Sequence, residues 1–395
     1  MEHDVKIACC VFTHNHAETM KDILDRAFPV YCHFGIDIYI YDDSTDQLTE
    51  DIVLEYIERQ SGHIFYIDAH MTSGAEEKTL YALKGYGFEK EYDYIWIAKD
   101  RVCFSENYLR RLLCVLERKA DVIMGMDVNN RWSVDRQCNC LSYEDPVKFY
   151  RDFGFYTTNY EMLCVRVEPL VSGTDWDKYE KEYHVDSTNP FNRYVWLFER
   201  FTEIKDITIE ICPYESGDMY ISPYSNSGWW SDLFPLWIDK WVSVNYTLPE
   251  IYAPYKMEVI KALTNRIDKF GSVEQMMNYH EQGIFTSGVF EKYKSMWQFI
   301  TEIPIEWLRL IAEDDYETVF RLAIGDFEKS IRERNYSRAY WLLFSNQWFS
   351  KVYSEQKYYA LLSALYCFYD QMINTGHSEA FEGLESIDDI VAKYG

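Results

Sequence analysis

Apolar and polar positions follow two alternating periods along the first 120 residues. Runs rich in β-branched and aromatic residues predict strands at 5–14, 36–46, 63–69 and 93–99. Between them apolar residues recur every three or four positions, which predicts helices at 17–28, 47–60, 75–90 and 105–119. Because strands and helices alternate, this part of the chain is expected to form a parallel, doubly wound α/β sheet.

The pattern changes twice in the remainder of the chain. Three further strands are predicted at 121–128, 161–170 and 207–212. From residue 257 onward the apolar spacing is helical throughout, with predicted helices at 257–270, 289–300, 305–334, 337–353 and 356–373. The two prolines of "LPEIYAPYK" mark a boundary near residue 255. We therefore expect an α/β domain at 1–255 and an all-α domain at 256–395.

Composition narrows the classes of partner. The formal net charge of −26 argues against binding to nucleic acid or to an anionic membrane. No stretch reaches the roughly 20 apolar residues that cross a membrane, and the first residues do not resemble a signal peptide. Ten scattered cysteines do not suggest a disulfide framework. A soluble, cytoplasmic protein with free thiols and no membrane span is expected.

Polar side chains follow each of the first four predicted strands. In chain order they are Thr13, His14 and Asn15; Asp42, Asp43, Ser44, Thr45 and Asp46; Ser73, Gly74 and Lys78; and Lys99, Asp100 and Arg101. Ligands of doubly wound sheets bind beyond the carboxyl ends of the strands, so these residues are candidates for a binding site. The acidic group could equally be an ordinary helix cap, because Asp, Ser and Thr start helices well.

In this order and spacing, the four groups resemble the amino-terminal half of GT-A-fold glycosyltransferases, most closely glycosyltransferase family 2. The resemblance covers residues 5–115 well and 120–255 loosely. It implies a Rossmann-like, mostly parallel sheet. It also implies an enzyme that moves a sugar from a nucleotide diphosphate donor, with a UDP-sugar favoured, to an acceptor hydroxyl with inversion. The acceptor would be a glycan, a glycoprotein or a polysaccharide precursor.

The resemblance also implies roles for individual residues. Thr13 and Asn15 would line the nucleotide pocket, with His14 close enough to touch the ligand. Asp42 or Asp43 would accept a hydrogen bond from the base or the ribose, and Lys78 would face the diphosphate.

The fourth strand end departs from the family pattern. The family has a D-x-D that binds a divalent metal, but Ala98 stands at the first acidic position and only Asp100 remains. Asp100 could bind Mn²⁺ or Mg²⁺ with help from water and the phosphates. Alternatively, Lys99 or Arg101 could neutralise the diphosphate without metal, or the segment could be an ordinary solvated turn. The metal is the favoured interpretation.

An inverting transfer also needs a general base. The aromatic stretch "SNSGWWSDLFPLWIDKW" offers Asp232 first and Asp239 second, with Asp175 behind them. An acid beside tryptophan would have its charged form disfavoured, which raises its pKa. The plain alternative is an aromatic surface or core helix with ordinary acids. The histidines other than His14 show no metal-like pairing, so we interpret them as structural: His16, His33, His63, His70 and His184.

Two other functions remain open from the sequence. The missing first Asp motivates one of them, a nucleotide-sugar-binding subunit that has lost activity. The helical tail could instead make the chain a protein-interaction module, and copies of the chain could also form a homo-oligomer.

Overall fold

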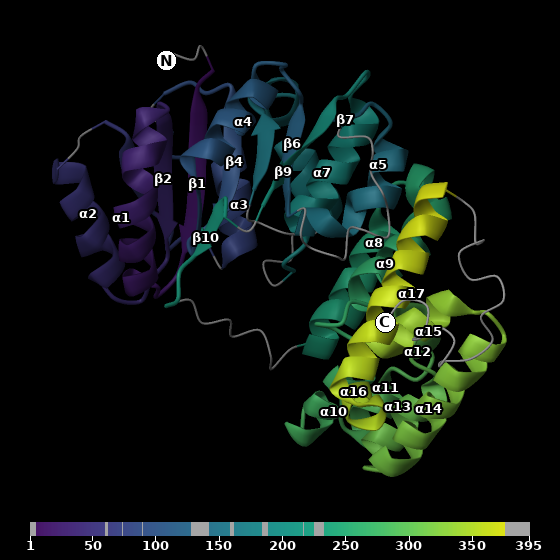
Figure 1. The fold of residues 1–395 in the computed structure, drawn as a ribbon. Coiled ribbons are helices and arrows are strands. Elements are labelled where there is room, and N and C mark those ends of the chain that lie inside the picture. Colours follow the sequence, from purple (N-terminus) through teal and green to yellow (C-terminus); the bar gives the residue numbers. More distant parts are fainter. Residues whose placement is uncertain are drawn as a thin grey trace. The chain divides into compact units, whose positions relative to one another are not determined.

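The computed structural model describes residues 5–59, 62–72, 74–88, 90–127, 142–158, 162–183, 189–215, 217–224 and 233–375. They divide into two compact units (Figure 1). The first holds the described residues of 1–131, 138–230 and 240–259. The second holds the described residues of 231–239 and 260–395.

The first unit is built on an eight-stranded sheet with the order β3-β2-β1-β4-β8-β6-β9-β7. Its strands are β1 (Ile7–Thr13), β2 (Ile36–Asp42), β3 (Ile64–Asp68), β4 (Tyr94–Lys99), β6 (Val122–Asp127), β7 (Ser142–Tyr143), β8 (Leu163–Arg166) and β9 (Ile209–Tyr214). Among these described strands, only β7 and β8 run antiparallel to their neighbours. A separate ribbon pairs β5 (Val102–Phe104) with β10 (Met219–Ile221). The expected mostly parallel α/β sheet, followed by a helical region, is confirmed.

Strand β1 marks the point where the strand order reverses. The chain leaves β1 for β2 and β3 on one side, then returns to β4 on the other side of β1. In open α/β sheets, this reversal leaves a crevice at the carboxyl ends of the two diverging strands. The ends of β1 and β4 are therefore where a ligand is expected.

Helices cover both faces of this sheet. They are α1 (Ala17–His33), α2 (Leu48–Arg59), α3 (Ala75–Leu83), α4 (Glu106–Leu116), α5 (Pro146–Phe153), α6 (Trp176–Tyr183), α7 (Asn192–Glu203) and α8 (Trp241–Thr247). Side chains alternate along a strand, so Cys9 and Val11 share a core with α1 and α4. Ala8 and Cys10 lie on the opposite face, where α3 packs against β1 and α7 against α3.

From α9 onward the described chain is helical. The bounds are α9 (Lys256–Thr264), α10 (Val273–Glu281), α11 (Ser287–Lys292), α12 (Trp297–Ile300), α13 (Ile305–Ala312), α14 (Tyr316–Arg332), α15 (Tyr336–Phe344), α16 (Phe349–Tyr353) and α17 (Glu355–Thr375). Consecutive helices α13, α14 and α15 pack on one another, and α17 packs on α15 and α16. In the core of this unit the Phe234 ring stacks on Phe270, with ring centroids 5.2 Å apart.

Several predicted helices are shorter or divided in the structure. The stretch 305–334 forms two helices, because Asp314 adopts a left-handed φ of 64° and the Asp315 side chain caps α14 by accepting from the Thr318 amide. The stretch 289–300 forms α11 and α12. The helix predicted at 75–90 ends at Leu83, before two glycines of positive φ, Gly85 and Gly87.

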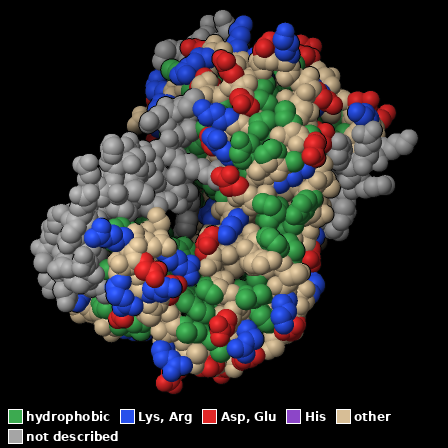
Figure 2. All heavy atoms as spheres, turned by 90° about the vertical axis from the view of Figure 1, so that its right-hand side faces the viewer, with side chains coloured by type: hydrophobic (Ala, Val, Ile, Leu, Met, Phe, Trp, Pro, Cys, Tyr) green, Lys and Arg blue, Asp and Glu red, His purple; other side chains and the backbone are tan. Residues whose placement is uncertain are grey.

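Two findings bear on possible partners of the chain. Within the described ranges, no helix has the length and apolar character needed to cross a membrane. On the face seen in Figure 2, Lys and Arg side chains are interspersed with Asp and Glu side chains, so the described acids form no unbroken acidic patch there.

The described cysteines are free, as expected: Cys9, Cys10, Cys32, Cys103, Cys114, Cys164 and Cys212.

Candidate functional site

Polar residues gather at the carboxyl edge of four neighbouring strands. In the register of the sheet, Thr13 at the end of β1 lies beside Asp42 at the end of β2, which in turn lies beside Asp68 at the end of β3. On the other side, Lys99 at the end of β4 is paired with Phe12. The strand-end residues singled out in the sequence therefore lie along one edge of the sheet. Ser73 lies outside the described residues.

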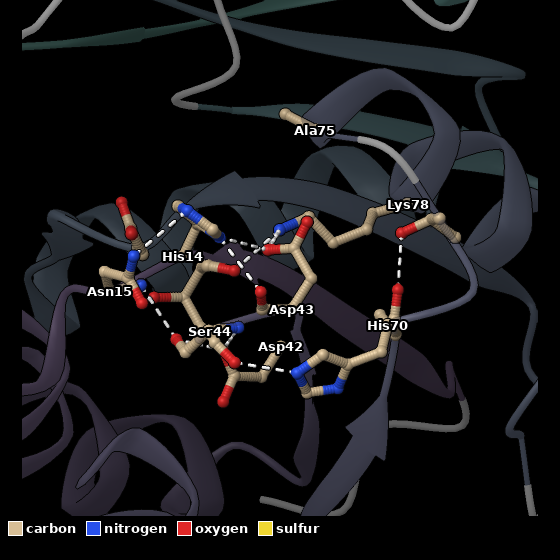
Figure 3. A network of polar contacts seen from close by, with 12 residues as sticks. His14, Asn15, Asp42, Asp43, Ser44, His70, Ala75 and Lys78 are labelled. Carbon is tan, nitrogen blue, oxygen red and sulfur yellow. Dashed lines mark hydrogen bonds and ion pairs between the residues drawn. The ribbon is translucent and has the colours of Figure 1, made fainter. Parts of the chain in front are cut away.

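Asn15 joins the loops that follow β1 and β2 (Figure 3). It adopts a left-handed φ of 55°, which Asn tolerates better than most residues. Its amide N–H donates to Ser44 Oγ at 2.8 Å, and its Oδ1 accepts from the Thr45 amide at 2.8 Å. The two loops are thus fixed to each other by a polar side chain from each.

Asp42 and Asp43 have different environments. Asp42 is 1% exposed, and its Oδ1 accepts from the Ser44 amide at 2.9 Å and from Ser44 Oγ at 2.5 Å. These bonds shape the loop after β2 and occupy Asp42. Asp46 caps α2 by accepting from the Leu48 amide at 3.0 Å, so the capping interpretation holds for Asp46.

Asp43 lies between a buried lysine and a histidine (Figure 3). Its Oδ1 accepts from Lys78 Nζ at 2.5 Å and lies 3.0 Å from His14 Nδ1. Lys78 is 2% exposed and donates a second hydrogen bond to the Thr13 carbonyl at 2.6 Å. The Thr13 hydroxyl is buried and has no hydrogen-bond partner among the described residues. Four of the predicted binding residues are therefore in contact at the end of β1.

The charges and donors of this cluster can be assigned from the geometry. Two oxygens of Asp43, its backbone carbonyl and Oδ1, face His14 Nδ1, and both are acceptors. On the other side of the ring, His14 Nε2 lies 3.1 Å from Asn15 Nδ2. The neutral imidazole with its proton on Nδ1 satisfies all three contacts. Asp43 is then the counter-ion of Lys78, so the buried cation is paired.

Asp100 contacts a histidine for which the sequence predicted a structural role. Its Oδ2 lies 2.6 Å from His16 Nδ1, and Asp100 is 8% exposed. The hydrogen bond to Asp100 raises the pKa of His16, against the opposing effects of burial and of the cations Arg101 and Lys78. The His16 side chain makes no capping bond to α1. The carboxylate therefore fixes the position of this imidazole.

The two cations that flank Asp100 lie at the end of β4 and in the turn that follows it. Arg101 is half-buried, and its carbonyl accepts from the Ser222 amide at 2.9 Å, which ties the turn after β4 to the end of β10. Lys99 is half-buried at the last position of β4. The order Lys99, Asp100 and Arg101 thus forms the link between β4 and β5.

His70 is a second residue that the sequence did not assign to the site. Its Nδ1 lies 2.6 Å from Asp68 Oδ1, and its Nε2 lies 2.7 Å from the Ser44 carbonyl (Figure 3). Both oxygens are acceptors, so the charged imidazolium satisfies both contacts. The hydrogen bond to Asp68 raises the pKa of His70, in agreement with this assignment. His70 thus ties the loop after β3 to the loop after β2.

A buried ion pair involves Glu76, on the same helix as Lys78. Glu76, on the first turn of α3, is 3% exposed and accepts from the Arg193 backbone amide at 2.9 Å. The Arg193 guanidinium, which is 1% exposed, places Nη1 3.8 Å from Glu76 Oε1 and donates through Nη2 to the Thr157 carbonyl at 3.2 Å. Burial raises the pKa of Glu76 to about 7, although the nearby Arg193 acts to lower it. The pair fixes α3, and with it Lys78, against α7.

Of the candidate general bases, the structure describes Asp239 and Asp175. Asp232 lies outside the described residues. Asp239 belongs to the second unit, where it is half-exposed and accepts from the Tyr293 hydroxyl at 2.8 Å and from Lys292 Nζ at 3.2 Å. Asp175 is exposed and accepts from the Lys178 amide at 3.0 Å at the start of α6. The role of a base stays a prediction for each of them.

The described residues hold no ready-made metal cage. Within the described parts of the chain, no group of three or more His, Cys, Asp or Glu side chains could hold a metal ion. Asp100 and His16 offer one oxygen and one nitrogen donor. Magnesium-type sites often have one or two protein carboxylates, with water and substrate phosphates as the other ligands. A cation at this edge would therefore need ligands from water and from a substrate in addition to these two donors.

Comparison with known sequences gives no assignment for this chain. No protein-family model matches it. No curated protein matches it either.

Comparison with solved structures finds partial similarities. The structure of S. aureus TarS 1–349 in complex with UDP-GlcNAc is 14% identical and covers 80% of this chain and 90% of that chain, with a TM-score of 0.48. The glucosyl-3-phosphoglycerate synthase from Mycobacterium tuberculosis, in complex with Mn²⁺, UDP and phosphoglyceric acid, is 11% identical over 57% of this chain and 72% of that chain, with a TM-score of 0.36. Mannosyl-3-phosphoglycerate synthase from Rubrobacter xylanophilus is 16% identical over 42% of this chain and 54% of that chain, with a TM-score of 0.30. At such identities and TM-scores, these similarities assign neither a family nor a ligand to this chain.

Proposed function

We propose that the chain is a glycosyltransferase that takes a sugar from a nucleotide diphosphate donor, with UDP-sugars favoured. The observation that carries the proposal is the contact of Asp43, Lys78 and the Thr13 carbonyl at the carboxyl edge of the sheet. It lies where the strand order reverses, and Asp100 follows the neighbouring strand β4. A carboxylate, a cation and a second carboxylate side by side suit a ligand with a ribose or base and a diphosphate.

The nucleoside would occupy the loops after β1 and β2. The Asp43 side chain is 11% exposed, and its contacts with His14 and Lys78 both reach Oδ1, so Oδ2 can accept from a ring N–H or a ribose hydroxyl. Of the two acids considered in the sequence, Asp43 is the stronger candidate, because Asp42 is only 1% exposed and holds the Ser44 amide and hydroxyl. Asn15 and Thr13 would line the same pocket, and Lys78 would place its positive charge at the diphosphate.

The end of β4 would receive the diphosphate. Asp100 is the acid available there for a divalent cation, with Mn²⁺ or Mg²⁺ expected and substrate phosphates supplying further ligands. When bound, such a cation stabilises negative charge on the leaving diphosphate. Lys99 and Arg101 flank Asp100 in sequence and would add positive charge at the same end of the strand. Asp100 therefore suits a cation whose remaining ligands are supplied by the substrate phosphates.

The transfer also needs a base for the acceptor hydroxyl. We propose that Asp232 or Asp239 removes the proton of an acceptor hydroxyl, so that the sugar is transferred with inversion in a single displacement. The acceptor class is a glycan, a glycoprotein or a polysaccharide precursor. A base must come within hydrogen-bond reach of that hydroxyl, so exchanging each acid for its amide tests both residues.

The first test is binding of UDP. Isothermal titration should show binding in the presence of Mn²⁺, and Asp43→Ala should weaken it about ten- to a hundredfold, because hydrogen bonds to charged groups contribute roughly 1.5–3 kcal/mol. Glu55→Ala is the control, since it removes an acid of α2 that is paired with Arg59 at the surface. No binding of UDP or of a UDP-sugar at millimolar concentration would contradict the proposed function.

Binding without turnover would have a different meaning. If the chain binds UDP-sugars but neither hydrolyses nor transfers them with any acceptor, the inactive nucleotide-sugar-binding subunit becomes the better interpretation. The missing acid at Ala98 is the feature that motivates this second candidate.

A further inference from the structure

The His16 side chain does not serve as a cap for the helix α1 that it precedes. It stands at the start of α1, but its imidazole makes no capping hydrogen bond. The backbone carbonyl alone serves the helix, by accepting from the Met20 amide at 2.8 Å. The imidazole instead lies 2.6 Å from Asp100 Oδ2, across 84 positions of sequence, with 36% of the side chain exposed. A residue from the loop after β1 is therefore held against the acid at the end of β4.

The chemistry of the pair fits a shared metal ion. Carboxylate oxygen and imidazole nitrogen are both common metal ligands. Two neighbouring ligands of one ion, each at about 2.1 Å from it, lie about 3 Å apart. The observed separation of 2.6 Å between His16 Nδ1 and Asp100 Oδ2 is within a small side-chain movement of that value. Both side chains retain some exposure, 36% for His16 and 11% for Asp100, so an ion and its water can reach them.

We propose that His16 is the second protein ligand of the divalent cation, in the place left by the acid missing at Ala98. Asp100 supplies the oxygen and His16 Nδ1 the nitrogen, and phosphate oxygens and water complete the coordination. The inference rests on the proposed function only for the phosphate ligands. A ligand pair of one nitrogen and one oxygen also changes the choice of metal, because imidazole favours first-row transition metals over Mg²⁺. Mn²⁺ should therefore bind better than Mg²⁺.

The surrounding charges predict cooperation with the nucleotide. Arg101 and Lys78 both act electrostatically on His16, so each also opposes a cation that binds there. A diphosphate would offset this positive charge and add ligands. Mn²⁺ alone should therefore bind weakly, and UDP should strengthen its binding by the same factor by which Mn²⁺ strengthens that of UDP.

The test is a titration of the full chain with Mn²⁺, followed by the electron paramagnetic resonance signal of the free ion, with and without UDP. His16→Asn should weaken Mn²⁺ binding at least about tenfold, because changes as remote as the outer shell of a site already cost about 10–100-fold. Asn caps helices well and can still donate to Asp100, so this variant should fold. The wild-type chain must bind Mn²⁺ in at least one of the two conditions, or the inference is wrong.

His63→Asn is the matched control. His63 Nδ1 lies 2.6 Å from Asp37 Oδ1, the same separation as in the His16 pair, but Asp37 is in β2 near its amino end. This control should bind Mn²⁺ like the wild type. Equal affinity of His16→Asn and the wild type would overturn the inference, as would equal loss in His16→Asn and His63→Asn.

A second substitution tests the preference among metals. His16→Asp replaces the nitrogen donor by oxygen, so it should bind Mn²⁺ and shift the ratio of Mg²⁺ to Mn²⁺ affinity toward Mg²⁺ by about tenfold or more. An unchanged ratio would overturn the role of His16 as a ligand. The Mn²⁺ titration without UDP separates this inference from the proposed function. If UDP does not bind but Mn²⁺ binding still depends on His16, the proposed function fails and the metal site stands.

Discussion

Replacing Asp100 by alanine should lower the turnover of the UDP-sugar by about 10²- to 10³-fold or more, because stabilisation of charge in the transition state is commonly worth several kcal/mol. Asp100 is the acid that the structure places at the end of β4, beside the strand reversal. A chelator should abolish the activity of the wild-type chain, and Mn²⁺ should restore it. Turnover is measured as release of UDP with and without acceptor.

The same experiment separates the alternatives that the sequence left open. If Lys99 or Arg101 neutralises the diphosphate without metal, a chelator should have little effect. Lys99→Met or Arg101→Met should then be as damaging as Asp100→Ala. Full activity of Asp100→Ala would reject both versions and leave the segment as an ordinary turn. Glu55→Ala again serves as the control for a lost acid at a surface position.

Removing the buried cation Arg193 should cost the first unit about 3–5 kcal/mol of unfolding free energy at pH 8, the usual cost of leaving one partner of a buried ion pair. Arg193→Met keeps much of the side-chain volume but leaves the Glu76 carboxylate buried without its cation. The measurement is urea unfolding followed by circular dichroism. Arg309→Met is the matched control, since its i,i+4 partner Glu313 is at the surface and the pair should contribute under about 1 kcal/mol.

The pH dependence gives this prediction a sign. The pKa of Glu76 is raised to about 7 from an ordinary value of 4.5, so the folded chain binds more protons there than the unfolded chain. Stability from this group therefore falls as the pH rises from 4.5 towards 7. Arg193→Met removes a group that lowers this pKa, so the variant should lose more stability at pH 8 than at pH 5. A cost that is the same at both pH values, or one that persists when Glu76→Gln is added, would contradict this account.

The sequence predicts the position of the site better than its internal contacts. Strand ends follow from local patterns, so the sequence alone places Thr13, Asp43 and Asp100 at one edge of a parallel sheet. The pairing of His16 with Asp100 could not be predicted, because it joins loops 84 positions apart and depends on β1 lying beside β4. Its only local signal was a histidine just before a helix and just after a strand end.

The distinction between Asp42 and Asp43 shows a second limit. Adjacent residues at the end of a strand point to opposite sides, so one of two consecutive acids turns inward and the other outward. The sequence "DD" does not say which, because that depends on the register of β2 against β1. The Ser44 bonds to Asp42 and the Lys78 bond to Asp43 decide it in the structure.

Strand orientation and helix breaks also escape the sequence patterns. The strand predicted at 161–170 exists, but an apolar run does not reveal that β8 lies antiparallel between β4 and β6. The stretch 305–334 has continuous helical spacing, so the left-handed turn at Asp314 is invisible to periodicity. The orientation of β8 depends on pairing with distant strands, whereas the helix break depends on the conformation of Asp314 and on the Asp315 cap.

The central place of β1 has a consequence for dynamics. Its backbone is hydrogen-bonded to β2 on one side and to β4 on the other, and every one of its side chains is buried. Amide protons in such a strand exchange with deuterium only through large openings of the unit, whereas those of edge strands exchange through local fraying. The Thr13 carbonyl, which accepts from Lys78, is at the end of this strand, and the loop that carries Asn15 and His16 follows it. Local unfolding can therefore free the outer rim of the site, at β3, while the geometry next to β1 persists.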